Sequence, residues 1–287
     1  MTDSPQPSRI AFIGAGNMAS AIFGGMLDSG YPAEAIVATS RSQEKRDAIS
    51  QRYGIRTMQD NLAAIEEADV VVLAVKPQMM RDLCLSLRES VQARRPLIVS
   101  VAAGLDAATL DRWLGGGLAL IRCMPNTPSL VGAGASGLYA NDRVSDAQRR
   151  LATELLESVG LVEWVEQEAQ IEAVTAISGS GPAYFFLFME SLEAAGVELG
   201  LSAESARRLA LQTAFGAAKM ARESEFDPAE LRRRVTSPNG TTERAIQAFE
   251  EAGLADIVGR ATRACAERAR ELSRELADKS LGESHGQ

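Results

Sequence analysis

The stretch RIAFIGAGNMASAI, residues 9–22, constrains the fold of this chain more than any other part of the sequence. A short β-rich run leads into Gly14-x-Gly16-x-x-Ala19, and a segment with helical spacing follows. In such a unit the first glycine makes a tight turn, the second lets the backbone approach a pyrophosphate, and a small third residue permits close helix–strand packing. The amides at the helix N-terminus then face the anionic phosphates. The stretch therefore predicts a dinucleotide-binding domain.

The segments that follow predict an α/β fold in two parts. Up to about residue 165, β-rich runs alternate with helical-period segments such as 17–29, 43–52 and 77–88, which is typical of a doubly wound, Rossmann-type parallel sheet. From about Glu168 to Leu276, strand-like runs vanish and Gly or Pro breaks separate helical segments. We expect a nucleotide-binding domain over 1–166 and an all-helical domain over 167–287, ending in a disordered tail. The predicted strands are RIAFIG, AIVATS, DVVVLAV, PLIVSVAAG, LALIRCMP, a weaker ASGLYA and an edge strand at VEWV.

Composition excludes several classes of function. A net charge of −8 and a pI near 5.0 argue against nucleic acid as a partner, because phosphate binding needs a basic face. Three scattered cysteines suggest neither a disulfide framework nor a metal site. We find no signal-peptide pattern in MTDSPQPSR and no apolar run long enough to span a membrane, so we expect a soluble, cytoplasmic protein.

The end of the second predicted strand indicates the nucleotide. NAD-binding strands usually end here in Asp or Glu, whose carboxylate bonds the ribose 2′-hydroxyl. This strand ends in Ser40 and Arg41, a hydroxyl and a guanidinium that suit a 2′-phosphate. The sequence therefore favours NADPH, with NADH as the alternative, unless Arg41 is only a solvated residue at a helix start.

A second glycine-rich stretch, ISGSGPAYFF at 177–186, raises a separate question. We predict a turn of small residues and then a helix beginning at Gly181-Pro182, since proline is tolerated in the first turn. The small residues would let the IRCMPN segment come close. Two interpretations stay open, tight helix packing at a dimer contact and a wall of the active site, and both can hold.

Six motifs carry a resemblance that covers about residues 10–276. They are GAGNMA, LAVKPQ (73–78), SVAAG (100–104), IRCMPNTP (121–128), SGSGPAY (178–184) and VTSPNGTT (235–242). In this order and spacing the chain closely resembles Δ1-pyrroline-5-carboxylate reductase. The resemblance implies reduction of pyrroline-5-carboxylate to L-proline with NAD(P)H, the last step of proline biosynthesis. It also implies a homodimer formed by the helical domain, and in many members a pentamer of dimers.

The resemblance also implies roles for individual residues. Substrate contacts fall on Glu168, Ser237, Gly240, Thr241 and Thr242, with Thr242 as the catalytic residue that hydrogen-bonds the ring nitrogen. Val101 and Ala103 should line the nicotinamide region. The remaining cofactor contacts fall on Phe12, Gly14, Ala15, Gly16, Asn17, Met18, Ser40, Asn61, Ala74, Val75, Lys76 and Pro77, in addition to Arg41 proposed above.

Two departures from the family pattern lie in the substrate loop and just before it. Asn239 stands where glycine is common, but Asn tolerates a left-handed backbone better than most residues. Arg234 stands where other members carry different polar residues, and its role is open.

Two alternative functions remain. The sole histidine, His285, lies in the tail, so chemistry that needs histidine is excluded, whereas hydride addition to a protonated imine needs mainly orientation and electrostatics. A β-hydroxyacid dehydrogenase would carry a lysine in or just after SGSGPAYFF, and this chain has none there. A non-catalytic NADP-binding regulator shares the fold, but would not need the hydroxyl-rich TSPNGTT loop.

Overall fold

The structure, a computed structural model, describes residues 6–282 of the 287. These form two compact units, residues 6–180 with 265–282, and residues 181–264. His285, in the tail predicted to be disordered, lies outside the described residues. The predicted boundary near residue 166 stays a prediction, because compactness does not test which segment folds independently.

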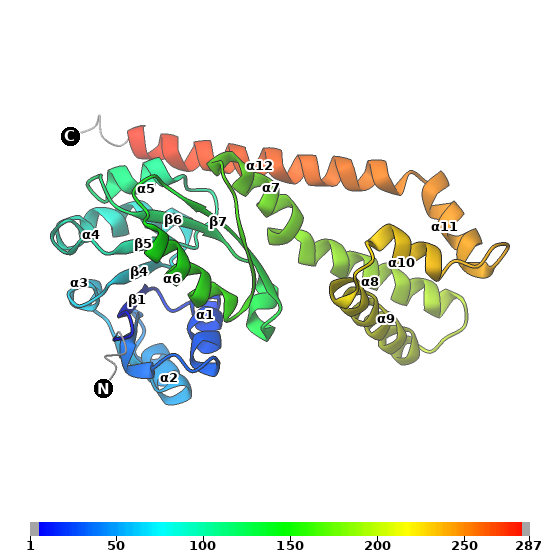
Figure 1. Cartoon of the computed structure of the whole chain (residues 1–287), viewed down its shortest axis with the longest axis horizontal. Helices are drawn as coiled ribbons and strands as arrows, with labels where there is room; N and C mark the ends of the chain where they lie inside the picture. Colours follow the sequence, from blue (N-terminus) through cyan, green and yellow to red (C-terminus); the bar gives the residue numbers. More distant parts are fainter. Residues whose placement is uncertain (1–5, 283–287) are drawn as a thin grey trace. The chain divides into compact units, whose positions relative to one another are not determined.

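The first unit is built on one eight-stranded sheet, which confirms the predicted fold class (Figure 1). The strand order is β3-β2-β1-β4-β5-β6-β7-β8, parallel except for the antiparallel pair β6–β7. The order reverses between β1 and β4, which creates the switch point where ligands bind in open α/β sheets. The strands are β1 (Ile10–Ile13), β2 (Ile36–Thr39), β3 (Arg56–Met58), β4 (Val70–Leu73), β5 (Leu97–Ser100), β6 (Leu120–Met124), β7 (Gly134–Ala140) and β8 (Gly160–Trp164).

Helices cover both faces of this sheet. Side chains of β1 alternate between two cores, with Phe12 in one and Ile13 in the other. The first core is covered by α1 (Asn17–Asp28), α2 (Gln43–Tyr53) and α6 (Asp146–Glu157). The second is covered by α3 (Asn61–Ile65), α4 (Met80–Arg94) and α5 (Ala107–Trp113). Because the central parallel strands β1, β2, β4 and β5 are buried on both faces, they read as nearly continuous apolar runs, which is why the sequence predicts them well.

The seven predicted strands are present, and an eighth, β3, was missed. It is only three residues long, and its burial runs from exposed Arg56 to half-buried Thr57 and Met58. Its sequence therefore lacks the apolar run that marks the other parallel strands. The omission matters because the Met58 carbonyl accepts the Ser40 amide at 3.1 Å.

The segment 168–180 was partly mispredicted. It comprises the 3₁₀ turn η4 (Glu168–Gln170), α7 (Ile171–Val174) and a π-helical turn, η5 (Thr175–Gly179). Of the small residues that we expected in a turn, Ser178 and Gly179 are therefore part of this π-helical turn, and Ser180 follows it. The helix expected at Gly181-Pro182 is confirmed as α8 (Gly181–Glu198).

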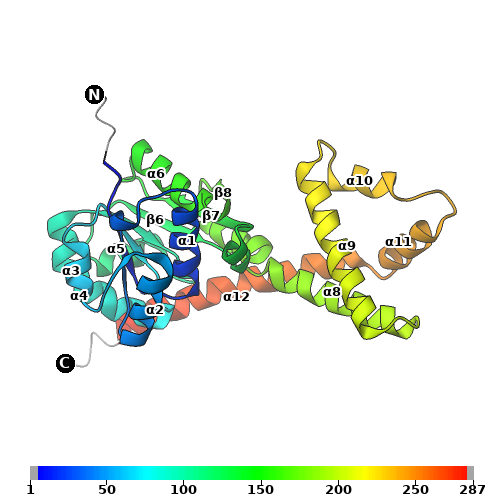
Figure 2. The ribbon, with the colours of Figure 1, turned by 90° about the horizontal axis from the view of Figure 1, so that it is seen from below.

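The second unit is helical, as predicted (Figure 2). The breaks fall at the predicted Gly and Pro positions, and Asp227 caps α10 by accepting the Glu230 amide at 2.7 Å. Among residues 6–282, no helix is both long and apolar enough to cross a membrane. The helices that follow α8 are α9 (Ala203–Glu223), α10 (Pro228–Arg234), α11 (Thr241–Glu251) and α12 (Leu254–Gly282), the last of which extends into the first unit.

Candidate functional site

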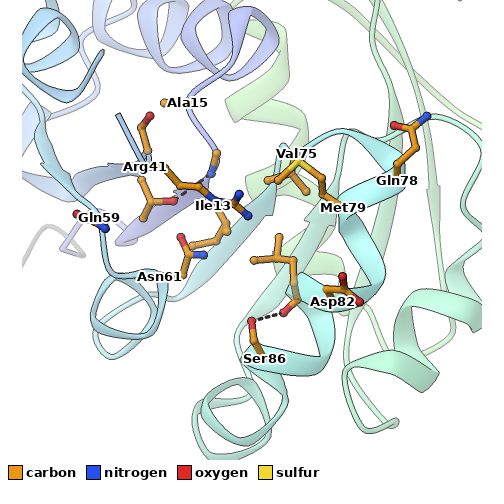
Figure 3. A pocket seen from close by; sticks show the side chains of 14 residues that line it. Ile13, Ala15, Arg41, Gln59, Asn61, Val75, Gln78, Met79, Asp82 and Ser86 are labelled. Atoms are coloured by element: carbon orange, nitrogen blue, oxygen red, sulfur yellow. Dashed lines mark hydrogen bonds between the residues drawn. The ribbon is translucent and has the colours of Figure 1, made fainter. Parts of the chain in front are cut away.

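A pocket of about 700 Å³ opens at the carboxyl edge of the sheet, beside β1, β2 and β4. In Figure 3, Arg41, Gln59 and Asn61 lie on one side of it, and Val75 and Met79 on the other. The lining residues are Ile13, Gly14, Ala15, Thr39, Ser40, Arg41, Gln59, Asn61, Val75, Gln78, Met79, Asp82, Leu83 and Ser86.

The Gly14 turn lines the pocket. Gly14 has φ of +96°, and a Cβ there would lie 2.8 Å from the Ala74 carbonyl oxygen, so only glycine fits. Its amide donates to Thr39 Oγ1 at 3.1 Å, and that hydroxyl donates to the Phe12 carbonyl at 3.4 Å. The buried Thr39 hydroxyl thus ties the end of β2 to the turn.

The N-terminus of α1 follows this turn and suits an anion. Gly16 is its N-cap residue, makes no side-chain cap, and has no acidic residue after it in the first turn. A Cβ at Gly16 would meet only the Ala74 oxygen, at 4.0 Å, so the space above it is open. Uncapped amides, a helix dipole and an open approach are the features that a pyrophosphate requires. The residues present therefore fit a dinucleotide.

Six of the predicted cofactor residues line the pocket: Gly14, Ala15, Ser40, Arg41, Asn61 and Val75. The side chain of Phe12 does not reach it, because that ring is fully buried and packs edge-on against Phe23. Val101 packs against the same core, whereas Ala103 and Lys76 are exposed. The others lie next to the lining segments, with Gly16, Asn17 and Met18 at the start of α1, Ala74 after β4, and Pro77 in the turn before α4.

Sequence reasoning missed the far wall of the pocket. Gln78, Met79, Asp82, Leu83 and Ser86 project from the start of α4 and the turn before it. A helix that directly follows a strand at the switch point was the available signal, since its first turns must border the ligand crevice. Thr39, the last residue of β2, and Gln59, which follows the unpredicted strand β3, were missed as well.

The motifs IRCMPNTP and SGSGPAY meet within the first unit. Asn126 donates from Nδ2 to the Ser178 carbonyl at 3.0 Å, while its Oδ1 accepts the Ala135 amide at 2.9 Å. A Cβ on Gly179 would lie 2.6 Å from Met124 Cε. The small residues of the π-helical turn thus let the IRCMPN segment come close, as predicted.

Glu168 belongs to the same region. Its Oε1 accepts hydrogen bonds from Arg122 at 2.8 Å and from the Ala107 amide at 2.6 Å. Its predicted substrate contact stays a prediction.

The TSPNGTT loop lies in the second unit, between α10 and α11. Asn239 has φ of +60°, which confirms that it adopts the left-handed conformation expected of it. Gly240 is the N-cap residue of α11 and makes no side-chain cap. Within the described chain, the hydroxyls of Ser237, Thr241 and Thr242 hydrogen-bond to no protein group, which leaves them available to a ligand.

The three arginines at 232–234 are paired with acids of the second unit. Arg233 and Arg234 both contact Glu230, at 2.6 and 2.8 Å, and Arg232 contacts Glu250 at 3.2 Å. Hydrogen bonds from Arg234 and Arg233 lower the pKa of the Glu230 carboxyl. The Arg234 guanidinium carbon also lies 3.6 Å from the centre of the Phe226 ring. These ion pairs therefore stabilise α10 and connect it to α11.

Both parts of the chain match known families. Residues 9–104 match a family described as NADP oxidoreductase, coenzyme F420-dependent, and residues 168–272 match pyrroline-5-carboxylate reductase dimerisation. The pyrroline-5-carboxylate reductase of Pseudomonas aeruginosa is 53% identical over 268 residues, which cover 93% of this chain and 98% of that protein. The chain belongs to the pyrroline-5-carboxylate reductase family.

Solved structures of pyrroline-5-carboxylate reductases agree with this assignment. That of the Coxiella burnetii protein has a TM-score of 0.91 at 46% identity, covering 93% of this chain and 99% of that one. That of the Plasmodium falciparum protein, with NADP bound, has a TM-score of 0.81 at 28% identity, covering 93% and 98%. The N-terminal part of this reductase-family chain is therefore an NADP-binding domain. Its helical part corresponds to a dimerisation domain, which implies a homo-oligomer.

Proposed function

We propose that this protein reduces Δ1-pyrroline-5-carboxylate to L-proline with NADPH, as the last step of proline biosynthesis. The observation that carries the proposal is the 53% identity to a pyrroline-5-carboxylate reductase over nearly the whole of both chains. The alternatives, a β-hydroxyacid dehydrogenase and a non-catalytic regulator, have no comparable support.

The chain's own residues fit NADPH. When bound, its nicotinamide supplies the hydride that reduces the C=N carbon. Backbone amides from Gly14 to Met18 hold the pyrophosphate, and Ser40 and Arg41 hold the 2′-phosphate, which favours NADPH over NADH. The other expected contacts are Phe12, through its backbone, Asn61, Ala74, Val75, Lys76, Pro77, Val101 and Ala103.

The substrate is held by the TSPNGTT loop. The open N-terminus of α11, with the hydroxyls of Ser237 and Thr241 and the backbone of Gly240, suits the substrate carboxylate. The Thr242 hydroxyl hydrogen-bonds the ring nitrogen and so orients the imine. Because reduction of a protonated imine yields a neutral amine and no alkoxide, the loop needs to orient and stabilise rather than supply a strong acid. Glu168 shapes the site near the substrate, with Oε1 already engaged by Arg122 and Ala107.

We further propose that the homo-oligomer is a dimer formed by the helical unit, with a pentamer of dimers as the larger assembly. Large apolar side chains on α8 and α9 are more than half exposed, among them Phe185, Phe186, Leu187 and Phe215. Large apolar side chains exposed in such number are typical of a protein that buries them against a partner. Light scattering after size-exclusion chromatography separates monomer, dimer and decamer. All three cysteines are free thiols, which is consistent with the reducing cytoplasm.

Initial rates of NADPH and NADH oxidation with pyrroline-5-carboxylate test the function, for the wild type, Thr242→Ala and Thr236→Ala. Thr236 is the control, because it lies in the same loop but donates its hydroxyl to the Arg232 carbonyl at 2.6 Å. We expect turnover by the wild type, a lower kcat/KM for Thr242→Ala, and near wild-type rates for Thr236→Ala. An absence of wild-type turnover with either nucleotide, despite measurable NADPH binding, would refute the proposal.

A further inference from the structure

Arg46 is a buried arginine that neither motif nor resemblance singled out. It lies near the start of α2, with 8% of its surface exposed. From Nη1 it donates to the Ser40 carbonyl at 2.6 Å and to the Arg41 carbonyl at 3.0 Å, and from Nη2 it donates to Gln43 Oε1. The guanidinium thus contacts the backbone of Ser40 and Arg41, the two residues predicted to recognise the 2′-phosphate.

The charge of Arg46 has no acidic counterpart. Within residues 6–282, no carboxylate lies within ion-pair distance of it, and the nearby Asp47 accepts a hydrogen bond from Gln43 Nε2 at 2.6 Å. Its hydrogen-bond acceptors are carbonyl dipoles and an amide oxygen. A buried charge without a counter-charge is only weakly screened, so it attracts an anion even without direct contact. This favours an anionic ligand at the adjoining pocket.

The contacts of Arg46 also orient the backbone of the loop. The C=O and N–H of one peptide plane point in opposite directions. With the Ser40 and Arg41 carbonyls turned toward Arg46, the amides of Arg41 and Ser42 are turned away from it. Neither amide donates to another group of the described chain, whereas the Ser40 amide is fixed by the Met58 carbonyl at 3.1 Å. The loop is therefore held so that the Arg41 and Ser42 amides remain free to donate. The Ser40 and Arg41 residues line the pocket.

We propose that Arg46 is a positioning residue that sets the preference for NADPH over NADH. It acts through Ser40 and Arg41, by fixing their carbonyls and by placing a positive charge behind the loop. The proposal rests on the proposed use of NADPH. It assigns no contact between Arg46 and the nucleotide.

The test compares adenosine 2′,5′-bisphosphate, which carries the 2′-phosphate, with 5′-AMP, which does not. Isothermal calorimetry on wild type, Arg46→Met and Arg46→Lys gives both affinities without turnover. Arg46→Met should weaken bisphosphate binding roughly tenfold or more and leave 5′-AMP binding nearly unchanged. The reason is that the loop loses the charge-assisted hydrogen bonds that hold the Ser40 and Arg41 carbonyls. Arg46→Lys should give partial rescue, since lysine keeps the charge but lacks the planar fork that reaches two carbonyls.

Arg52→Met is the matched control, because it removes an exposed arginine from the same helix, one that lies over the Tyr53 ring. It should leave the ratio of the two affinities at the wild-type value. Equal losses for both nucleotides in Arg46→Lys, or no loss for either, would overturn the inference. Arg46→Lys decides the matter if Arg46→Met fails to fold. The kcat/KM ratio for NADPH over NADH should fall in parallel. If the wild type does not reduce pyrroline-5-carboxylate, the function fails, but the calorimetric comparison still tests Arg46.

Discussion

Arg122 and Glu168, 46 residues apart, form a hydrogen-bonded ion pair of 2.8 Å within the first unit. The Arg122 side chain is 6% exposed and that of Glu168 is 26% exposed. The same Glu168 oxygen accepts the amide of Ala107, the first residue of α5. One carboxylate therefore connects β6, the start of α5 and the start of the helical segment that leads to the π-helical turn.

Arg122 and Glu168 should contribute to the stability of the first unit as a coupled pair. Glu168→Ala leaves the Arg122 charge buried, and we expect a loss of about 2–4 kcal/mol in the free energy of unfolding. In the double variant Arg122→Met/Glu168→Ala no unpaired charge remains, so its loss should fall below the sum of the single losses by about 1–3 kcal/mol. Urea unfolding of the wild type, Glu168→Ala, Arg122→Met and the double variant measures this coupling. Strictly additive losses would show that the two residues act independently.

Gly14 and Gly16 should respond differently to alanine. Gly14→Ala places a Cβ 2.8 Å from the Ala74 oxygen at φ of +96°, and we expect destabilisation of about 1–3 kcal/mol. Gly16→Ala meets no protein atom closer than 4.0 Å, so the melting temperature should hold while NADPH binding weakens. Thermal unfolding and fluorescence titration of NADPH measure both effects. Normal NADPH affinity in Gly16→Ala would exclude close approach of the pyrophosphate at this residue.

Asn239 tests whether the left-handed backbone of the substrate loop matters for catalysis. Asn239→Gly should retain activity, because glycine adopts φ of +60° without strain. In Asn239→Val a β-branched residue would occupy that conformation, with a strain of about 1–3 kcal/mol. We expect its kcat/KM for pyrroline-5-carboxylate to fall and its NADPH affinity to stay normal. Equal activity of the valine and glycine variants would rule out this requirement.

Two buried thiols predict a loss of stability at alkaline pH. Burial raises the pKa of Cys84 and of Cys123 from 9.0 to about 12 each. Because the folded-state pKa is raised, this stabilisation is complete below pH 9 and is lost as the pH rises toward 12. Each thiol contributes a slope of up to about 1.4 kcal/mol per pH unit in that range.

Urea unfolding with reductant, between about pH 8 and pH 10, measures this slope. The variant Cys84→Ala/Cys123→Ala is the control, since it lacks both thiols but keeps Tyr31, whose pKa burial also raises, to about 12. It should show a clearly shallower decline. An identical decline in wild type and variant would assign the alkaline loss to other groups.

The sequence by itself determined those features that depend on neighbours along the chain. Gly14 and Gly16 predict the turn because a short motif fixes its own backbone conformation. The central strands are predicted because each is an apolar run, and the helix breaks follow from Gly and Pro. The left-handed conformation of Asn239 was indicated by its position, where glycine is common in the family and which Asn tolerates.

Only the tertiary structure decided which distant groups meet. β3 carries little signal of its own and becomes a strand because β2 offers it an edge. The same arrangement fixes the Ser40 amide against Met58, and the burial of Arg46 beneath Ser40 and Arg41 depends on how α2 packs. Arg122 and Glu168 are ordinary charged residues in the sequence, and strand register and helix packing brought them within hydrogen-bonding distance. Motifs record local conformation, whereas such pairs depend on distances that no single segment of the chain specifies.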